Sequence, residues 1–353
     1  MSFAVGHEFE VYFATNRNMT GSNSAPSFGE RFHRDGANFY RVGRARVRKV
    51  SDDLDDGYEV VSVRTDAEGT RATTAHRLGS KALFADIKGR MIAETCDAIV
   101  YLHGFANTFE DGIKRAAQLH EAYEITPRDG GAPYHPVVLA FCWPSNGSTT
   151  PPWEYFSDRD DAKASGTAMA RAVMRFVDFM ADGGDPCRQR IHVVAHSMGN
   201  WALRHTVQGL KEFSSGSQLA AIFDNVFLMA ADEDDDSLEH DHKLRPLCEL
   251  ARRVHVYHSA DDGALVISDK TKFNPDRLGY NGLRTFSGIS TRVVAVDCEA
   301  VDDTEVLQVN HQYYRRRPEV IADVRQVLSG TRPDAIAGRE VVEPGRRYRI
   351  RAG

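Results

Sequence analysis

Short apolar runs separated by stretches of helical spacing are the feature that most constrains the fold of this chain. From residue 97 onward, the apolar runs occupy residues 97–102, 137–142, 191–195, 225–229, 254–258 and 292–296. Runs of this length without a polar face are typical of strands that are covered on both sides. The helical stretches between them supply that cover. The pattern therefore predicts βαβ units, which build a mostly parallel central sheet with helices on both faces.

The rest of the chain divides into an N-terminal region and a C-terminal tail. Strands are predicted at residues 9–14, 45–50 and 58–63. Helices are predicted at residues 79–94, at 157–182 and after residue 318. Residues 18–38 are rich in Asn, Ser, Gly and Pro, which indicates a loop insertion. We expect a single α/β domain over residues 1–330, followed by a polar C-terminal tail over residues 331–353.

Charge and cysteine content exclude several classes of function. The formal net charge is −6, whereas nucleic-acid-binding domains are strongly basic, so no nucleic-acid partner is expected. The five cysteines are widely spaced and form no C-x-x-C pair, which favours a reducing compartment over a disulfide framework. The N-terminus lacks a signal-peptide pattern, and no apolar stretch reaches the roughly 18 residues of a membrane span. We expect a cytoplasmic protein; its oligomeric state is not predicted.

The apolar run 191–195 leads into a candidate nucleophile. Residues 195–199 read A-H-S-M-G, one residue away from G-x-S-x-G, and a helical stretch follows. In that motif the serine occupies a sharp strand-to-helix turn, and the residues two positions away must be small to avoid a clash. Gly199 meets this need and Ala195 adds only a methyl group. The pattern predicts Ser197 as nucleophile, with the backbone N–H of Met198 directed at a developing oxyanion.

A second turn, His103-Gly104-Phe105, follows the run 97–102. In enzymes with such a serine turn, a second oxyanion N–H comes from the loop after an early strand. Gly104 allows the backbone to approach a substrate closely, and Phe105 would donate its N–H. The structural alternative is a tight turn with a buried His103. We also expect His103, Gly104, Trp143 and His196 to line the substrate pocket. Trp153, Tyr155 and Phe156 would either wall the pocket or belong to the core.

Chain order selects the general base. The serine comes first in this arrangement, the acid second and the histidine last, after the final strand. His311 is the only histidine beyond His258, and it lies between the last apolar run and the last helix. We therefore expect His311 to be the base that accepts the proton of Ser197.

The acid is less determined by the residues themselves. Asp261 and Asp262 both follow the run 254–258, and chain order does not separate them; the other one would be a solvated helix cap. Asp232 and Asp234 form a rival pair one strand earlier, within an acidic run of the kind that is more often a solvated loop. Residues 239–242, Glu-His-Asp-His, could be interpreted as metal ligands, but their setting in a polar loop argues against this. No metal or cofactor is expected.

These motifs, in this order, resemble an uncharacterised, mainly bacterial family of α/β-hydrolases. The shared segments are Tyr12 to Arg17 (Y-F-A-T-N-R), His103 to Asn107 (H-G-F-A-N), Cys142 to Gly147 (C-W-P-S-N-G), Ala195 to Asn200 (A-H-S-M-G-N), Leu228 to Asp232, Ser259 to Leu265 and His311 to Tyr313. The resemblance covers roughly residues 10–330 and implies the α/β-hydrolase fold. It also implies that alanine is normal at position 195 of the turn that carries Ser197, and it favours Asp262 over Asp261 as the acid. The departures, Phe13, Ala106 and Cys142, remove no catalytic group.

The sequence therefore predicts a serine hydrolase with carboxylesterase-like chemistry. Ser197, His311 and Asp262 would form the triad and pass through an acyl-enzyme on a small-molecule acyl substrate. A thioesterase, an amidase or a lipase would use the same triad. A catalytically silent hydrolase fold that serves as a binding module is the alternative from another class.

Overall fold

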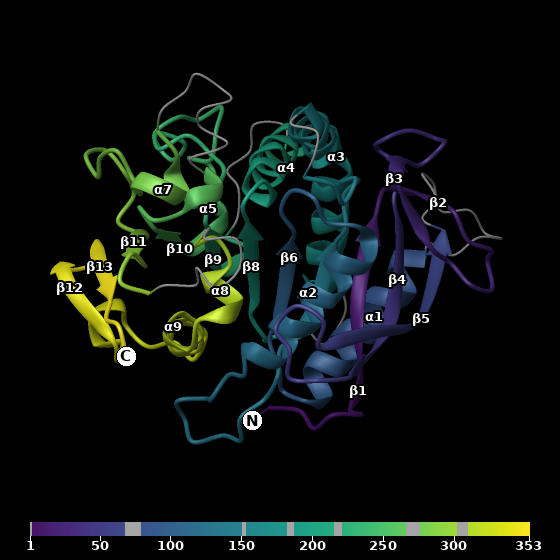
Figure 1. Ribbon diagram of the computed structural model, residues 1–353, viewed down its shortest axis with the longest axis horizontal. Helices are drawn as coiled ribbons and strands as arrows, with labels where there is room; N and C mark the ends of the chain where they lie inside the picture. Colours follow the sequence, from purple (N-terminus) through teal and green to yellow (C-terminus); the bar gives the residue numbers. More distant parts are fainter. Residues whose placement is uncertain are drawn as a thin grey trace.

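The computed structural model describes residues 2–67, 79–149, 153–181, 187–214, 221–265, 276–301 and 310–353. Its main sheet has eleven strands in the order β12-β13-β11-β10-β9-β8-β6-β7-β1-β4-β5, which runs from left to right in Figure 1. The strands are β1 (Glu8–Thr15), β4 (Arg41–Lys49), β5 (Tyr58–Ala67), β6 (Ala98–Leu102), β7 (Val137–Phe141), β8 (Ile191–His196), β9 (Phe223–Met229), β10 (Ala251–His258), β11 (Val293–Asp297), β12 (Arg339–Glu343) and β13 (Arg347–Ile350).

The predicted mostly parallel sheet is confirmed. Every neighbouring pair from β13 to β1 is parallel, and the antiparallel pairs are β12–β13 at one edge and β1–β4 and β4–β5 at the other. All residues of β6, β7 and β8 are buried, as expected for strands covered on both faces. The central position of β8 places residue 197 at the middle of the carboxyl edge of the sheet, where ligands bind in open α/β sheets.

The helices form two layers that follow the alternation of side chains along the strands. They are α1 (Gly79–Ala93), α2 (Phe109–Ala122), α3 (Trp153–Ala181), α4 (Gly199–Phe213), α5 (Leu247–Leu250), α7 (Leu278–Asn281), α8 (Tyr313–Arg316) and α9 (Pro318–Leu328). Val100 and Val193 share one core with α1, α3 and α4, whereas Ile99 and Val194 share the other with α2, α8 and α9. Helices therefore cover both faces, because successive strand residues point to opposite sides.

Helices α3 and α4 pack against each other at very short range. A Cβ built on Gly166 of α3 would lie 2.5 Å from the Cβ of His205 in α4, so only glycine allows this approach. The indole Nε1–H of Trp201, in the first turn of α4, also donates to the backbone carbonyl of Arg159 in α3 at 3.1 Å. The first turns of α3 are thereby fixed beside the start of α4, at the carboxyl edge of the sheet (Figure 1).

Two local expectations were wrong. Residues 331–353 are not only a polar tail, because they contain the 3₁₀ turn Pro333–Ala335 and strands β12 and β13, and β13 pairs with β11 in the main sheet. The short β13 exposes its arginines and buries Tyr348 and Ile350, so its apolar signal was too brief to be recognised. Within the expected loop at 18–38, strands β2 (Arg17–Met19) and β3 (Phe28–Phe32) form a separate two-stranded sheet.

Candidate active site

Ser197 occupies the turn between β8 and α4 with a left-handed backbone, φ +52°. A non-glycine residue in this region carries a strain of roughly 1–3 kcal/mol, which the surrounding structure must hold. Two hydrogen bonds to the segment of β9 do so: the N–H of Ser197 donates to Met229 at 2.9 Å, and its carbonyl accepts from the N–H of Asp232 at 3.2 Å. The geometry is that of a strand-to-helix elbow.

The small residues around Ser197 have distinct structural reasons. A Cβ on Gly199 would lie 2.5 Å from the carbonyl oxygen of Leu102, so the start of α4 can pack on the end of β6 only with glycine here. Ala195 is fully buried. The side-chain amide of Asn200 donates to the carbonyls of Ala195 and Ser197 at 3.0 and 3.1 Å. Asn200 therefore closes the turn, a role that its place in the motif did not reveal.

The structure brings His311 and Asp262 together. The Nδ1 of His311 lies 2.7 Å from Oδ2 of Asp262, and the carboxylate is fully buried while the imidazole is about one-tenth exposed. The other carboxylate oxygen accepts the backbone N–H of Leu265 at 3.1 Å. Asp261, by contrast, is exposed. Of the two adjacent acids, the one that faces His311 is therefore Asp262.

The backbone of His311 is attached directly beside the elbow. The Nε2–H of His196, the residue before Ser197, donates to the carbonyl of His311 at 3.1 Å, and the two rings lie 4.7 Å apart. The ring of Tyr314 also stacks on the imidazole of His196, with 4.5 Å between the ring centroids. Burial holds the pKa of His196 well below its usual value, so this imidazole is a neutral donor and brings no charge to the site.

The loop after β6 packs against the elbow. A Cβ on Gly104 would lie 3.0 Å from the Cβ of Ser197, which shows how closely the two turns approach. His103 is buried and stacks on Trp143 at 4.8 Å, and the indole N–H of Trp143 donates to the carbonyl of His103 at 3.0 Å. Burial lowers the pKa of His103 to about 3. His103 and Trp143 therefore support the loop as neutral buried residues, while Phe105 is half-buried.

A buried arginine, Arg17, holds the same loop after β6 by hydrogen bonds to backbone carbonyl groups. The guanidinium of Arg17 donates to the carbonyls of Asn107 at 2.7 Å, Ser145 at 2.9 Å and Gly29 at 3.1 Å. Burial lowers the pKa of Arg17 to about 10, so it remains protonated. Its three acceptors come from segments far apart in the sequence: two are in loops and Gly29 is in strand β3. In the sequence, Arg17 is the last residue of the motif Tyr12 to Arg17, and its place there predicts no role for it.

Asp158 in α3 completes this support. Its carboxylate accepts the backbone N–H groups of Ala106 at 3.3 Å and Asn146 at 3.2 Å, and also the hydroxyl of Ser145. Ala106 has a positive φ of +56°, so the loop turns sharply directly after Phe105. Burial raises the pKa of Asp158. The shape of the loop is thus set by groups that lie outside it.

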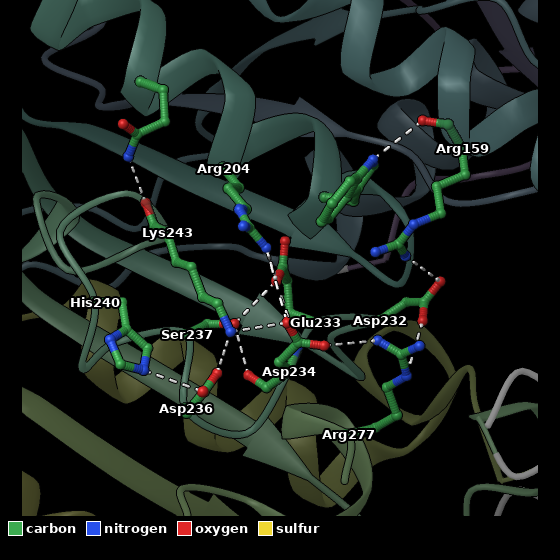
Figure 2. A network of polar contacts seen from close by, with 12 residues as sticks. Arg159, Arg204, Asp232, Glu233, Asp234, Asp236, Ser237, His240, Lys243 and Arg277 are labelled. Atoms are coloured by element: carbon green, nitrogen blue, oxygen red, sulfur yellow. Dashed lines mark hydrogen bonds and ion pairs between the residues drawn. The ribbon is translucent and has the colours of Figure 1, made fainter. Parts of the chain in front are cut away.

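The rival acids after β9 are committed elsewhere. Asp232 accepts the hydroxyl of Tyr155 and lies 3.7 Å from Nε of Arg277, and Asp234 lies 3.3 Å from the same guanidinium. Figure 2 shows Arg159 and Arg277 on opposite sides of the Asp232 carboxylate, within a network of acids and cations. Among the described residues, the carboxylate that lies against the imidazole of His311 is that of Asp262.

The described residues hold no group of three or more His, Cys, Asp or Glu side chains that could bind a metal ion. Within the same residues, no helix is long and apolar enough to cross a membrane. Of the aromatic residues expected near the pocket, Tyr155 packs edge-on against Phe105 at 5.5 Å, whereas Trp153 and Phe156 are exposed at the start of α3.

A family model described as "Alpha/beta hydrolase of unknown function (DUF900)" matches residues 81–332. The match includes the strands from β6 to β11 and both helical layers of the main sheet. It leaves out β1, β4 and β5 at one edge of the sheet and β12 and β13 at the other. A comparison with curated proteins finds no match.

Proposed function

The chain belongs to this family of alpha/beta hydrolases of unknown function, and from that membership we propose a serine hydrolase that cleaves acyl esters through an acyl-enzyme. The observation that carries the proposal is the 2.7 Å contact between His311 Nδ1 and the buried Asp262, in a loop attached beside the elbow of Ser197. The arrangement follows the logic of the serine triad: nucleophile, base and orienting acid.

In the proposed reaction, Ser197 Oγ attacks the acyl carbon and transfers its proton to Nε2 of His311. Asp262 accepts the Nδ1–H, which fixes the tautomer and stabilises the imidazolium. The oxyanion of the tetrahedral intermediate would accept the backbone N–H groups of Met198 and Phe105. When the intermediate collapses, the ester C–O bond breaks and His311 returns the proton to the departing alcohol. Water then repeats the sequence on the acyl-enzyme and releases the carboxylic acid.

The rigidity of the oxyanion loop supports this assignment. Donors aimed at a transition-state charge are effective when they do not reorganise during the reaction. The buried side chains of Arg17 and Asp158 form hydrogen bonds with the backbone of the loop that contains Phe105. At Gly104, the same loop packs closely against Ser197. Such fixed backbone beside a strained serine is the setting in which acyl transfer is favoured.

Covalent labelling tests the proposal. A fluorophosphonate should label the wild-type protein and release of p-nitrophenol from p-nitrophenyl hexanoate should be measurable, whereas Ser197→Ala should abolish both. Unchanged circular dichroism of the variant would show that the fold persists. Equal labelling of the variant and the wild type would remove Ser197 from this role, and the absence of labelling and hydrolysis in the wild type would remove the function.

A further inference from the structure

Tyr155 spans the front of the elbow. Its ring packs edge-on against Phe105, which follows β6, and its hydroxyl donates to Asp232, which follows β9. In the sheet, β8 lies between β6 and β9, and Ser197 follows β8. A side chain that contacts residues of both flanking loops lies beside the strand end that carries Ser197. In the proposed reaction, Tyr155 would form one wall of the acyl site.

Arg159 lies one helical turn further along α3. Its Nη1 donates to the hydroxyl of Tyr155 at 3.5 Å, and the nearest oxygen of Asp232 is 3.9 Å away, beyond hydrogen-bond distance. The side chain is 18% exposed. Arg159 thus reaches the same wall, and its contact with the neighbouring carboxylate is loose.

The guanidinium of Arg159 is held in place by an aromatic ring. Its Cζ lies 3.5 Å from the centroid of Trp201, within the range of cation–π attraction, and the indole N–H of Trp201 donates to the backbone carbonyl of Arg159. Trp201 belongs to the first turn of α4, four residues after Ser197. Because one ring fixes both the backbone and the side chain, little conformational entropy remains to be lost when a ligand binds.

The three arginines in Figure 2 differ in their partners. Arg277 is buried between Asp232 and Asp234, and Arg204 pairs with the buried Glu233 at 3.4 Å. Among the described residues, the carboxylate oxygen nearest to Arg159 lies 3.9 Å away, and none of them accepts a hydrogen bond from its Nε or Nη2. Its planar donor groups are therefore available to a ligand in a way that those of the other two are not.

We propose that Arg159, positioned by Trp201, makes this enzyme selective for ester substrates that carry a carboxylate, such as half-esters of dicarboxylic acids. A guanidinium offers parallel N–H groups that match a carboxylate. A neutral alkyl chain in the same place would remove water from the guanidinium without replacing those hydrogen bonds, which disfavours it. The inference rests on the proposed function, because it assigns a substrate class to that same site.

Matched esters test the proposal. p-Nitrophenyl hexanoate and p-nitrophenyl hydrogen adipate have acyl chains of equal length and differ in the terminal carboxylate. Arg159→Gln should lower kcat/KM for the adipate ester by about 10- to 100-fold, the range expected for hydrogen bonds to a charged group. Hydrolysis of the hexanoate should not fall, because its alkyl chain accepts no hydrogen bond from Arg159, and this activity also shows that the variant is folded. A second arm, with phenyl and p-carboxyphenyl hexanoate, places the carboxylate on the leaving group.

Arg34→Gln is the matched control, because it removes the same charge from a side chain that is 90% exposed, and it should leave both rates unchanged. Loss of the preference in either arm on changing Arg159, but not Arg34, supports the proposal. Equal loss for neutral and anionic esters, or no preference for the carboxylate in either arm, overturns it. If Ser197 reacts with a neutral fluorophosphonate in that case, only the substrate class is wrong; if it does not, the proposed function fails as well.

Discussion

The loops after β9 and β10 both place carboxylates at the carboxyl edge of the sheet, yet they surround them differently. Asp262, after β10, is fully buried and contacts one imidazole and one backbone N–H. Asp232, Glu233 and Asp234, after β9, pair with two buried or half-buried arginines and a lysine (Figure 2). An acid that serves a proton-transfer base needs a partner that can gain and lose a charge, whereas permanently charged arginines make the other acids part of the scaffold.

The largest expected effect is a loss of catalytic rate when the acid in the loop after β10 is changed. Asp262→Asn should lower kcat for ester hydrolysis on the order of 10⁴-fold, because His311 loses its orienting acceptor and counter-charge. Rates with p-nitrophenyl hexanoate measure this. Asp261→Asn is the matched control on the exposed neighbour and should remain active. A crippled Asp261→Asn beside an active Asp262→Asn would reverse the assignment.

The next effect concerns stability instead of rate. Arg277→Met should lower the free energy of unfolding by about 3 kcal/mol, because it leaves Asp232 and Asp234 without their buried partner. Urea denaturation followed by circular dichroism measures it. Asp262→Asn should cost less stability than Arg277→Met, and the opposite order would show that the two loops do not divide their roles in this way.

A smaller effect is a dependence of stability on pH. Burial raises the pKa of Glu233 to about 7 from an ordinary value of 4.5, so the folded state holds this proton more tightly than the unfolded state. The contribution is fully present below pH 4.5 and is lost as pH rises through about 7. Glu233→Gln should therefore reduce the fall in Tm between pH 5 and pH 8. A variant whose Tm falls as steeply as that of the wild type would contradict the raised pKa.

The fold was largely predictable because its signals are local. Runs such as 137–142 and 191–195 are apolar throughout, and the strands Val137–Phe141 and Ile191–His196 lie at those positions with every residue buried. The tail was not predictable in the same way. Its strand Arg347–Ile350 has only two inward-facing side chains, and it is recognisable as a strand only once Arg347 pairs with Ala295.

The residues that support the candidate site could not be predicted from the sequence either. Arg17 and Asp158 are separated by more than a third of the chain, and nothing in their neighbourhoods says that both hold the loop of Phe105. Tyr155 was expected either in the pocket wall or in the core, and only the structure reveals its contacts with Phe105 and Asp232. Hydrogen bonds of this kind depend on which strands are neighbours, and that is a property of the whole sheet.

The sequence by itself determined the alternation of strands and helices, the small-residue turn around Ser197 and, through chain order, His311 as the one candidate base. These follow from hydrophobic periodicity and from steric limits that act over a few residues. Only the tertiary structure decided which of two adjacent aspartates faces that histidine: Asp262 is buried against it and Asp261 is exposed. The two residues have the same side chain and follow the same strand, so the choice rests on the direction in which the folded loop turns each carboxylate.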